Sequence, residues 1–295
     1  MSESIKTIDP KDLSTGELHG YLLGAVAPRP IAFASTIDAE GRVNLSPFSF
    51  FNVFGSNPPL MIFSSARRVR DNTTKHTLEN VQAVPEVVIN IVNYPIVEQM
   101  SLASTEYPQG VNEFIKSGLT QSPSDVVRPP RVAEAPVAFE CKVQQVIETG
   151  NEGGAGNLIL SEVVKIHIRS SYLNADGKLD LDKLDLVGRM GGSYYVRASG
   201  DALFEIPKPI RTRGIGVDAL PDSVQDSRVL TGNQLGRLGN LAAWPDQQKA
   251  RQRLEQNEDL VELLSAEQEK IHTRVSLLLN TDRLDEAADL LAATS

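Results

Sequence analysis

The side chains most suited to chemistry in this sequence are hydroxyls and cations between residues 35 and 77. They fall at expected strand ends and at the start of an expected helix: Ser35, Thr36, Ser64, Ser65, Arg67, Arg68, Lys75 and Thr77. A phosphate monoester needs several hydrogen-bond donors and about two positive charges, which hydroxyls, an arginine fork and a helix N-terminus supply together. Alternatively, Arg67, Arg68 and Arg70 form a solvated run on the surface. The residue types alone leave an anion site and a charged surface segment equally open.

The stretch from Arg29 to Asn52 is expected to position part of this set. Apolar side chains alternate between two faces over Pro30–Thr36, as in a half-buried strand, and Asp38–Gly41 supplies the turn that follows. A return strand over Arg42–Ser46 leads into Ser46–Asn52, whose sequence is SPFSFFN. Here hydroxyls, an amide and aromatic rings surround a proline, which cannot donate to a sheet ladder. Such a segment can line a pocket.

The rest of residues 1–209 alternates between short strands and short helices. We expect strands at Leu60–Ser64, Val87–Val92, Val137–Thr149, Asn157–Arg169 and within Leu186–Arg197, helices at Thr15–Leu23, Thr74–Val84, Pro95–Ser104 and Gln109–Ser117, and a loop at Pro123–Pro136. The glycine-rich residues 150–156 are interpreted as a hairpin connection, because a phosphate-cradling loop would be followed by a helix. The expected fold class is therefore mainly β (α+β), an antiparallel barrel with inserted short helices.

The composition changes after Pro207 and Pro209, so we expect a boundary there. Residues 1–209 form the β-rich domain, and residues 210–295 form an extension that is first loop-rich and then α-helical. Apolar spacing predicts helices at Gln247–Leu264 and Leu284–Leu291. This extension is expected to pack on the barrel or on a second subunit.

The composition also disfavours several classes of function. A net charge of −9 argues against broad binding to nucleic acid or to an anionic membrane. The single Cys141 excludes an internal disulfide and a cysteine metal cluster, which fits a cytoplasmic protein. The four histidines are scattered, so no metal site is predicted, and no Gly-x-Ser-x-Gly motif supports hydrolase chemistry. No apolar run is long enough to span a bilayer.

A further set of motifs runs from about Leu22 to Lys208. It consists of Arg29-Pro30-Ile31-Ala32, Ser35-Thr36, Asn44 to Asn52, Ser64-Ser65, Lys75-His76-Thr77-x-x-Asn80, Val88-Ile89-Asn90, Glu106-Tyr107-Pro108, Pro129-Pro130-Arg131-Val132 and Gly188-Arg189-Met190-Gly191-Gly192. In this order the motifs resemble the flavin reductase-like family of FMN-binding split barrels. The resemblance implies an antiparallel split β-barrel, usually a homodimer that holds the flavin in a groove near the subunit interface.

The resemblance also implies a set of cofactor-binding residues. Those along the isoalloxazine and ribityl chain would be Ser35, Thr36, Ser46, Pro47, Phe48, Ser49 and Asn52, and those holding the phosphate would be Ser64, Ser65, Arg67, Lys75 and Thr77. The cofactor would be FMN, with FAD as the alternative. His76 stands where family members commonly have Asp; if that Asp orients the lysine, the phosphate site here is weaker or pH-dependent.

The activity implied is that of an NAD(P)H:flavin reductase, which supplies reduced flavin to a partner monooxygenase or electron-transfer protein. No catalytic side chain is assigned, because backbone N–H groups and hydroxyls can stabilise the charge that develops on the flavin. One alternative is an electron-transfer flavoprotein that retains FMN and lacks a nicotinamide site. A second is an FMN-dependent enzyme acting directly on an organic substrate, with the C-terminal helices closing over the flavin. A third is a non-enzymatic interaction module that uses the helical extension.

Overall fold

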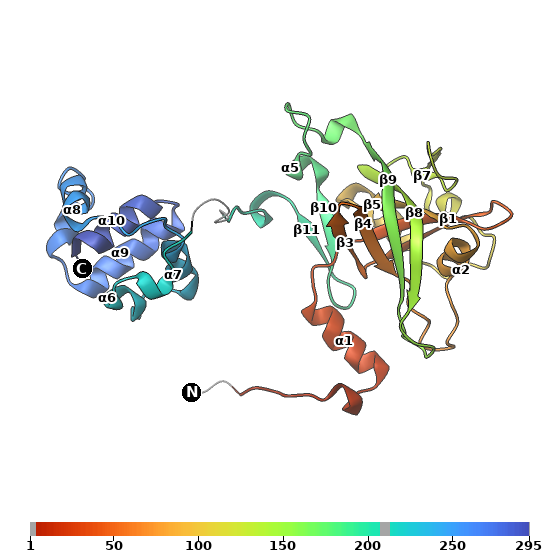
Figure 1. The fold of residues 1–295 in the computed structure, drawn as a ribbon, viewed down its shortest axis with the longest axis horizontal. Coiled ribbons are helices and arrows are strands. Elements are labelled where there is room, and N and C mark those ends of the chain that lie inside the picture. Colours follow the sequence, from red (N-terminus) through yellow and green to blue (C-terminus); the bar gives the residue numbers. More distant parts are fainter. Residues whose placement is uncertain (1–3, 207–212, 295) are drawn as a thin grey trace. The chain divides into compact units, whose positions relative to one another are not determined.

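The computed structural model describes residues 4–206 and 213–294 of the chain. It divides into two compact units, Met1–Phe204 and Glu205–Ser295, and each is described here by itself (Figure 1). The boundary expected at residue 209 lies outside the described residues.

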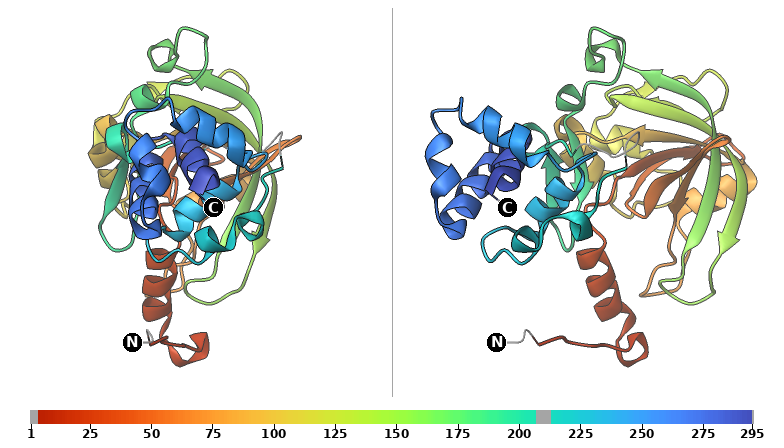
Figure 2. Two further views of the ribbon diagram at one scale, coloured as in Figure 1. Left: turned by 90° about the vertical axis from the view of Figure 1, so that its left-hand side faces the viewer. Right: turned by 60° about the vertical axis from the view of Figure 1, so that its left-hand side comes forward.

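The N-terminal unit is built on a seven-stranded sheet in the order β2-β1-β5-β8-β9-β4-β3. The strands are β1 (Ala32–Ile37), β2 (Val43–Phe48), β3 (Phe51–Ser56), β4 (Pro59–Ser64), β5 (Glu86–Ile91), β8 (Val137–Glu148) and β9 (Asn157–Ile168). Every pair of neighbours is antiparallel, and the sheet curves strongly around its interior (Figure 2). The predicted antiparallel, strand-rich architecture with inserted helices is confirmed.

The remaining elements of this unit are short. They are α1 (Thr15–Ala25), α2 (His76–Ala83), α3 (Val97–Leu102), α4 (Glu113–Ser117), α5 (Leu181–Leu184), β6 (Gln121–Ser122), β7 (Arg131–Val132), β10 (Leu186–Arg189) and β11 (Tyr195–Ala198), with 3₁₀ helices at Pro10–Asp12, Tyr94–Ile96, Ser170–Tyr172 and Gly200–Ala202. The pairing of β6 with β7 corrects the expectation that Pro123–Pro136 is only a loop. Each of these strands is two residues long, which is too short for a periodic pattern in the sequence to predict it.

Strand β1 is covered on both of its faces. The sequence predicts a half-buried strand, but all six of its residues are buried. Ala34 packs with Leu78 of α2 in one apolar cluster, whereas Phe33 packs with Phe114 of α4 in another. Successive side chains of β1 point to opposite faces, and each face is packed by its own apolar cluster.

The segment around Pro47 differs from its prediction. The sequence indicates only a pocket lining after a return strand, but Pro47 lies within β2 and pairs with Phe33, and β3 follows directly at Phe51. The proline is tolerated because β2 is an edge strand of the sheet and does not need its N–H for a second neighbour. The hairpin predicted around residues 150–156 is confirmed, since β8 and β9 pair along their length.

The C-terminal unit is α-helical, with α6 (Asp222–Gln225), α7 (Gly232–Gly239), α8 (Gln247–Leu254), α9 (Gln268–Asn280) and α10 (Leu284–Thr294), and 3₁₀ helices at Val217–Ala219 and Val261–Ser265. Its core gathers around α10, where Leu290 is fully buried. The single helix expected over Gln247–Leu264 is wrong, because the Asn257 side chain accepts the Asp259 N–H and favours a turn. In the described part of the chain, no helix has the length and apolar content needed to cross a membrane.

Candidate functional site

One pocket of the N-terminal unit gathers much of the predicted anion site, and we name it the α2 pocket. It is lined by the cationic or basic side chains of Arg68, Lys75 and His76, by the hydroxyls of Ser46, Thr77, Ser104 and Thr105, and by the carboxylates of Glu106 and Glu113. Ser46 comes from β2, Arg68 from the segment before α2, and residues 75–77 from the N-terminus of α2. The others lie between the end of α3 and the first residue of α4. Residues far apart in the sequence therefore meet at one helix end.

The N-terminus of α2 presents hydrogen-bond donors to this pocket. Lys75 is its N-cap residue and makes no side-chain hydrogen bond to the first turn. The N–H groups of His76 and Thr77 consequently have no partner inside the helix. The Thr77 hydroxyl accepts a hydrogen bond from Asn44 Nδ2 (2.9 Å), which leaves its own hydrogen available for donation. The helix end is thus suited to an anion.

Lys75 brings a positive charge that has no counter-ion among the residues that the structure describes. Its Nζ lies 5.1 Å from the centroid of the Phe48 ring, and no ion pair or hydrogen bond of this ammonium is present among the described residues. Burial lowers the pKa of Lys75, the nearby Arg68 charge lowers it further, and Glu106 partly opposes both. A partly buried, unpaired ammonium is costly, so an anionic ligand would stabilise it.

The two neighbouring arginines have different roles. Arg68 lines the α2 pocket, where its Nε lies 3.1 Å from Glu106 Oε1, and Arg70 binds the same carboxylate. Arg67, for which the sequence predicts a contact with phosphate, instead donates to Asn72 Oδ1 (2.7 Å) and to the Asn72 carbonyl (2.8 Å). It is not among the lining residues of the pocket.

Several other predicted site residues lie away from the α2 pocket. Ser35 and Thr36 are consecutive in β1, so their side chains point to opposite faces of the sheet. Thr36 accepts from Asn80 (3.1 Å), whereas the buried Ser35 hydroxyl has no partner among the described residues. Ser64 and Ser65 end β4 beside the β8–β9 connection, and the Ser65 hydroxyl is also buried without a partner in the described part of the chain.

Within the segment Ser46–Asn52, Ser46 lines the α2 pocket and the later residues lie outside its lining. The Phe48 ring is buried and packs on Phe63, with 5.2 Å between centroids. Pro47 and Ser49 are partly exposed, and Arg29 Nε approaches the Ser49 hydroxyl at 3.5 Å. Asn52 is exposed, and its side-chain oxygen accepts the adjacent Val53 N–H (2.8 Å).

Sequence reasoning missed two carboxylates in the pocket. Glu113 is 5% exposed and accepts the Leu45 N–H at 2.9 Å. Burial raises the pKa of Glu113, and the hydrogen bond from Leu45 and the nearby His76 partly offset this. Glu106 belongs to the motif Glu106-Tyr107-Pro108, to which the sequence assigns no role. Glu106 follows α3 and Glu113 begins α4, and neither position indicates in the sequence that these residues border the same pocket as Lys75.

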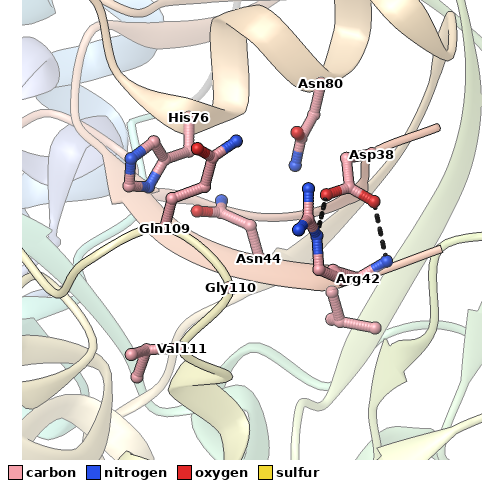
Figure 3. A pocket seen from close by; sticks show the side chains of 9 residues that line it. Asp38, Arg42, Asn44, His76, Asn80, Gln109, Gly110 and Val111 are labelled. Atoms are coloured by element: carbon pink, nitrogen blue, oxygen red, sulfur yellow. Dashed lines mark hydrogen bonds and ion pairs between the residues drawn. The ribbon is translucent and has the colours of Figure 1, made fainter. Parts of the chain in front are cut away.

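A smaller polar pocket adjoins the first and shares Asn44 and His76 with it. Figure 3 shows His76, Gln109 and Asn44 pointing toward one another, with Asp38 and Arg42 paired at the far side (Arg42 Nε to Asp38 Oδ2, 2.5 Å). His76 therefore stands between the two pockets.

Comparison with known proteins identifies the family. Residues 24–180 match the model described as a flavin reductase like domain. The chain belongs to the flavin reductase-like family. An uncharacterized protein of Aquifex aeolicus is 37% identical over 196 residues, which cover 66% of this chain and 97% of that protein.

Two solved structures extend the likeness. Nitrilotriacetate monooxygenase component B from Bacillus cereus is 27% identical, with a TM-score of 0.65, and the match covers 70% of this chain and 100% of that one. The Pseudomonas fluorescens 2-nitrobenzoate 2-nitroreductase is also 27% identical, with a TM-score of 0.61 and coverage of 68% and 96%. The predicted family and its split-barrel fold are confirmed.

The residues of this flavin reductase-like domain fit the phosphate of a flavin mononucleotide. The unpaired Lys75 ammonium, the hydroxyls of Ser46 and Thr77 and the free N–H groups of α2 all border one pocket. A phosphate dianion would receive charge and hydrogen bonds from each of these groups. The chemistry of the donors therefore agrees with the flavin cofactor that the family supports.

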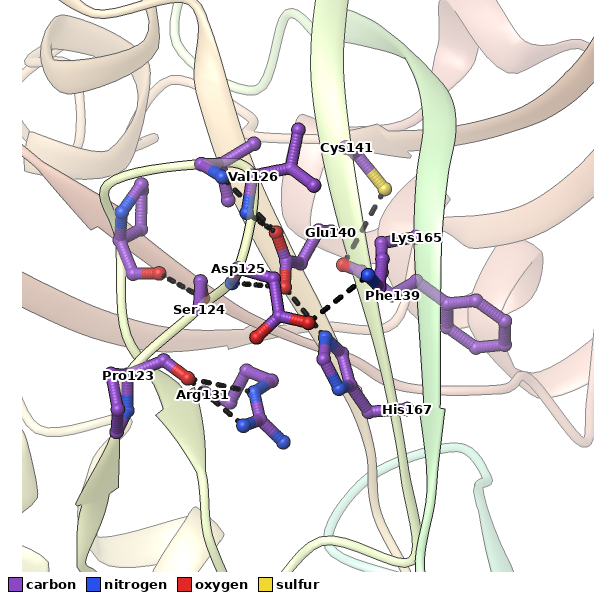
Figure 4. Close-up of polar contacts among 12 residues, drawn as sticks. Pro123, Ser124, Asp125, Val126, Arg131, Phe139, Glu140, Cys141, Lys165 and His167 are labelled. Atoms are coloured by element: carbon purple, nitrogen blue, oxygen red, sulfur yellow. Dashed lines mark hydrogen bonds and ion pairs between the residues drawn. The ribbon is translucent and has the colours of Figure 1, made fainter.

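One further polar cluster resembles a metal site in composition. Single ligand atoms of Asp125, Glu140 and His167 lie within 4.8 Å of one another (Figure 4). However, Glu140 Oε1 accepts from the Asp125 N–H (2.7 Å) and pairs with His167 Nε2 (2.5 Å), and its Oε2 accepts from the N–H groups of residues 126 and 127. A carboxylate has about four lone-pair positions, so these bonds occupy all of them. The Glu140 carboxylate thus holds the loop at residues 125–127 against strand β8.

Proposed function

We propose that this protein is an NAD(P)H-dependent flavin reductase that binds FMN and delivers reduced flavin to a partner oxygenase. The α2 pocket carries the proposal, because it offers an unpaired ammonium and a free helix N-terminus suited to the phosphate of FMN. The likeness to a protein named as component B of a monooxygenase supports a reductase that works with a second protein.

The chain's own residues would divide the work of binding. Lys75, Arg68, Thr77 and Ser46 would hold the phosphate at the end of α2. The backbone of Ser46–Asn52 would run along the flavin ring, with the buried Phe48 keeping water from one side of it. The bound flavin supplies the chemistry of accepting a hydride. The protein positions the two reactants and stabilises charge with N–H groups, which requires no side-chain acid.

The proposal includes a homodimer in the cytoplasm, where NAD(P)H is available. Large apolar side chains are exposed on the edge strand β3, where Val53 is 57% and Phe54 63% exposed, and on α1. A second copy covering these side chains would remove them from water. Light scattering of the purified protein is expected to give the molar mass of two chains. The mass of a single chain would contradict the dimer.

A second candidate is an FMN-dependent enzyme that reduces an organic substrate directly. The 27% identity to a protein named as a nitroreductase supports this candidate. In this case the flavin would remain bound during turnover.

The decisive experiment is anaerobic mixing of the protein and FMN with NADH, and separately with NADPH. We expect rapid loss of the visible absorbance of oxidised flavin with one donor, and no dependence of this rate on an added nitroaromatic compound. Bound FMN that neither nucleotide reduces would contradict the reductase. Repeated reduction and reoxidation of the bound flavin that occurs only when the nitroaromatic compound is present would favour the second candidate.

A further inference from the structure

The α2 pocket contains two carboxylates beside the groups suited to phosphate. Glu106 is bound to Arg68 across 3.1 Å and also to Arg70, so part of the pocket's positive charge is already neutralised. Glu113 borders the same pocket from the start of α4 and is 5% exposed. The other titratable groups that line the pocket are Lys75, His76 and Tyr107.

Both carboxylates act against a bound dianion. In a partly buried site, a like charge a few ångströms away costs much more than it does in water. A phosphate that binds near Arg68 must also share that guanidinium with Glu106 or displace it. A site that retains phosphate tightly would instead surround it with cations, hydroxyls and N–H groups only.

We propose that Glu106 and Glu113 are affinity-determining residues that keep phosphate binding in the α2 pocket weak, so that FMN exchanges with the solution instead of remaining bound. This inference rests on the proposed function, since only a reductase that gives away its reduced flavin needs an exchangeable site. It predicts weak binding of FMN, whereas a flavoprotein that retains FMN for electron transfer needs tight binding.

The pocket also predicts the direction of pH dependence. As the pH rises, Glu113 gains a negative charge and Lys75 finally loses its positive one, and both of these changes on the protein weaken the binding of phosphate. Burial raises the pKa of Glu113, which brings its ionisation closer to neutral pH. Because both groups act in one direction, substitutions are needed to separate their effects.

The test measures dissociation constants of FMN and of riboflavin, which lacks the phosphate, by quenching of flavin fluorescence. In Glu106→Gln and in Glu113→Gln we expect FMN to bind about tenfold more tightly than in the unchanged protein, with riboflavin unaffected. Glutamine keeps an oxygen to accept the Leu45 N–H, so Glu113→Gln retains that contact. The gain for Glu113→Gln should shrink as the solution is made acidic.

The matched control is Glu98→Gln on α3, a glutamate outside the pocket, which should leave both constants unchanged. FMN affinity that is unchanged or weaker in both pocket variants would overturn the proposal, as would equal tightening of riboflavin. Reduction by NAD(P)H at saturating FMN is measured separately. Its absence, with FMN still tightened in the variants, would contradict the reductase function and leave the role of the carboxylates supported.

Discussion

Replacing Lys75 by methionine is expected to weaken FMN binding about a hundredfold and to change riboflavin binding little. A charge-assisted hydrogen bond from a buried ammonium to a phosphate contributes about 1.5–3 kcal/mol, and a hundredfold corresponds to about 2.7 kcal/mol. Methionine preserves most of the length of the side chain and its packing on Phe48, so the loss reports the charge. Titration of each flavin by fluorescence quenching provides the two constants.

The same substitution should leave the fold as stable as before, or more so. Burial lowers the pKa of Lys75, which means that the folded protein disfavours the charged ammonium relative to the unfolded chain. Lys142→Met on β8 is the matched control, because it removes an exposed ammonium and should alter neither flavin constant. Equal losses for FMN and riboflavin in Lys75→Met would place the flavin phosphate elsewhere. A lower melting temperature would indicate a structural role for Lys75.

The parts of this site that sequence could predict are those set by local structure. The β1–β2 and β8–β9 hairpins follow from alternating side chains and turn residues. The start of α2 follows from the apolar spacing of its helix, and this places Lys75 and Thr77 at its N-terminus. A helix end suited to phosphate is therefore predictable without any tertiary contact.

The rest of the site depends on long-range packing. Nothing local indicates that Glu106 and Glu113, which follow α2 by many residues, border the same pocket as Lys75. Arg67 and Arg68 differ because the nearby Asn72 binds the guanidinium of Arg67, whereas the guanidinium of Arg68 depends on the distant Glu106. The separation of Ser35 from Thr36, in contrast, follows from strand alternation alone and was available from the sequence.

The effect of His76 on the phosphate site remains a prediction from the sequence. His76 borders both pockets and makes no side-chain hydrogen bond among the described residues. An imidazole carries no negative charge, so it orients an ammonium less strongly than the aspartate common in the family would. Like the carboxylates of Glu106 and Glu113, His76 therefore favours weak binding of phosphate in the α2 pocket.

Replacing Glu140 by alanine should be the most destabilising single change considered for the N-terminal unit, with a loss of about 3–5 kcal/mol in the free energy of unfolding. The carboxylate is fully buried and holds three consecutive N–H groups of residues 125–127 together with His167 (Figure 4). Although burial opposes its charge, the N–H of Asp125 and the His167 side chain keep the pKa of Glu140 below its usual value. Without the carboxylate, these four donors lose their shared acceptor.

Urea unfolding followed by circular dichroism measures this loss, with Glu148→Ala as the control. Glu148 lies at the exposed end of the same strand β8, so its removal should change stability by less than about 0.5 kcal/mol. The loss of stability in Glu140→Gln should fall between those of Glu140→Ala and Glu148→Ala, because one oxygen remains to accept hydrogen bonds while the new amide faces donors.

The only tryptophan, Trp244, lies in the C-terminal unit, so its fluorescence identifies the transition of that unit. An alanine variant as stable as the Glu148 control would mean that water replaces the carboxylate, and that the loop at residues 125–127 does not depend on Glu140.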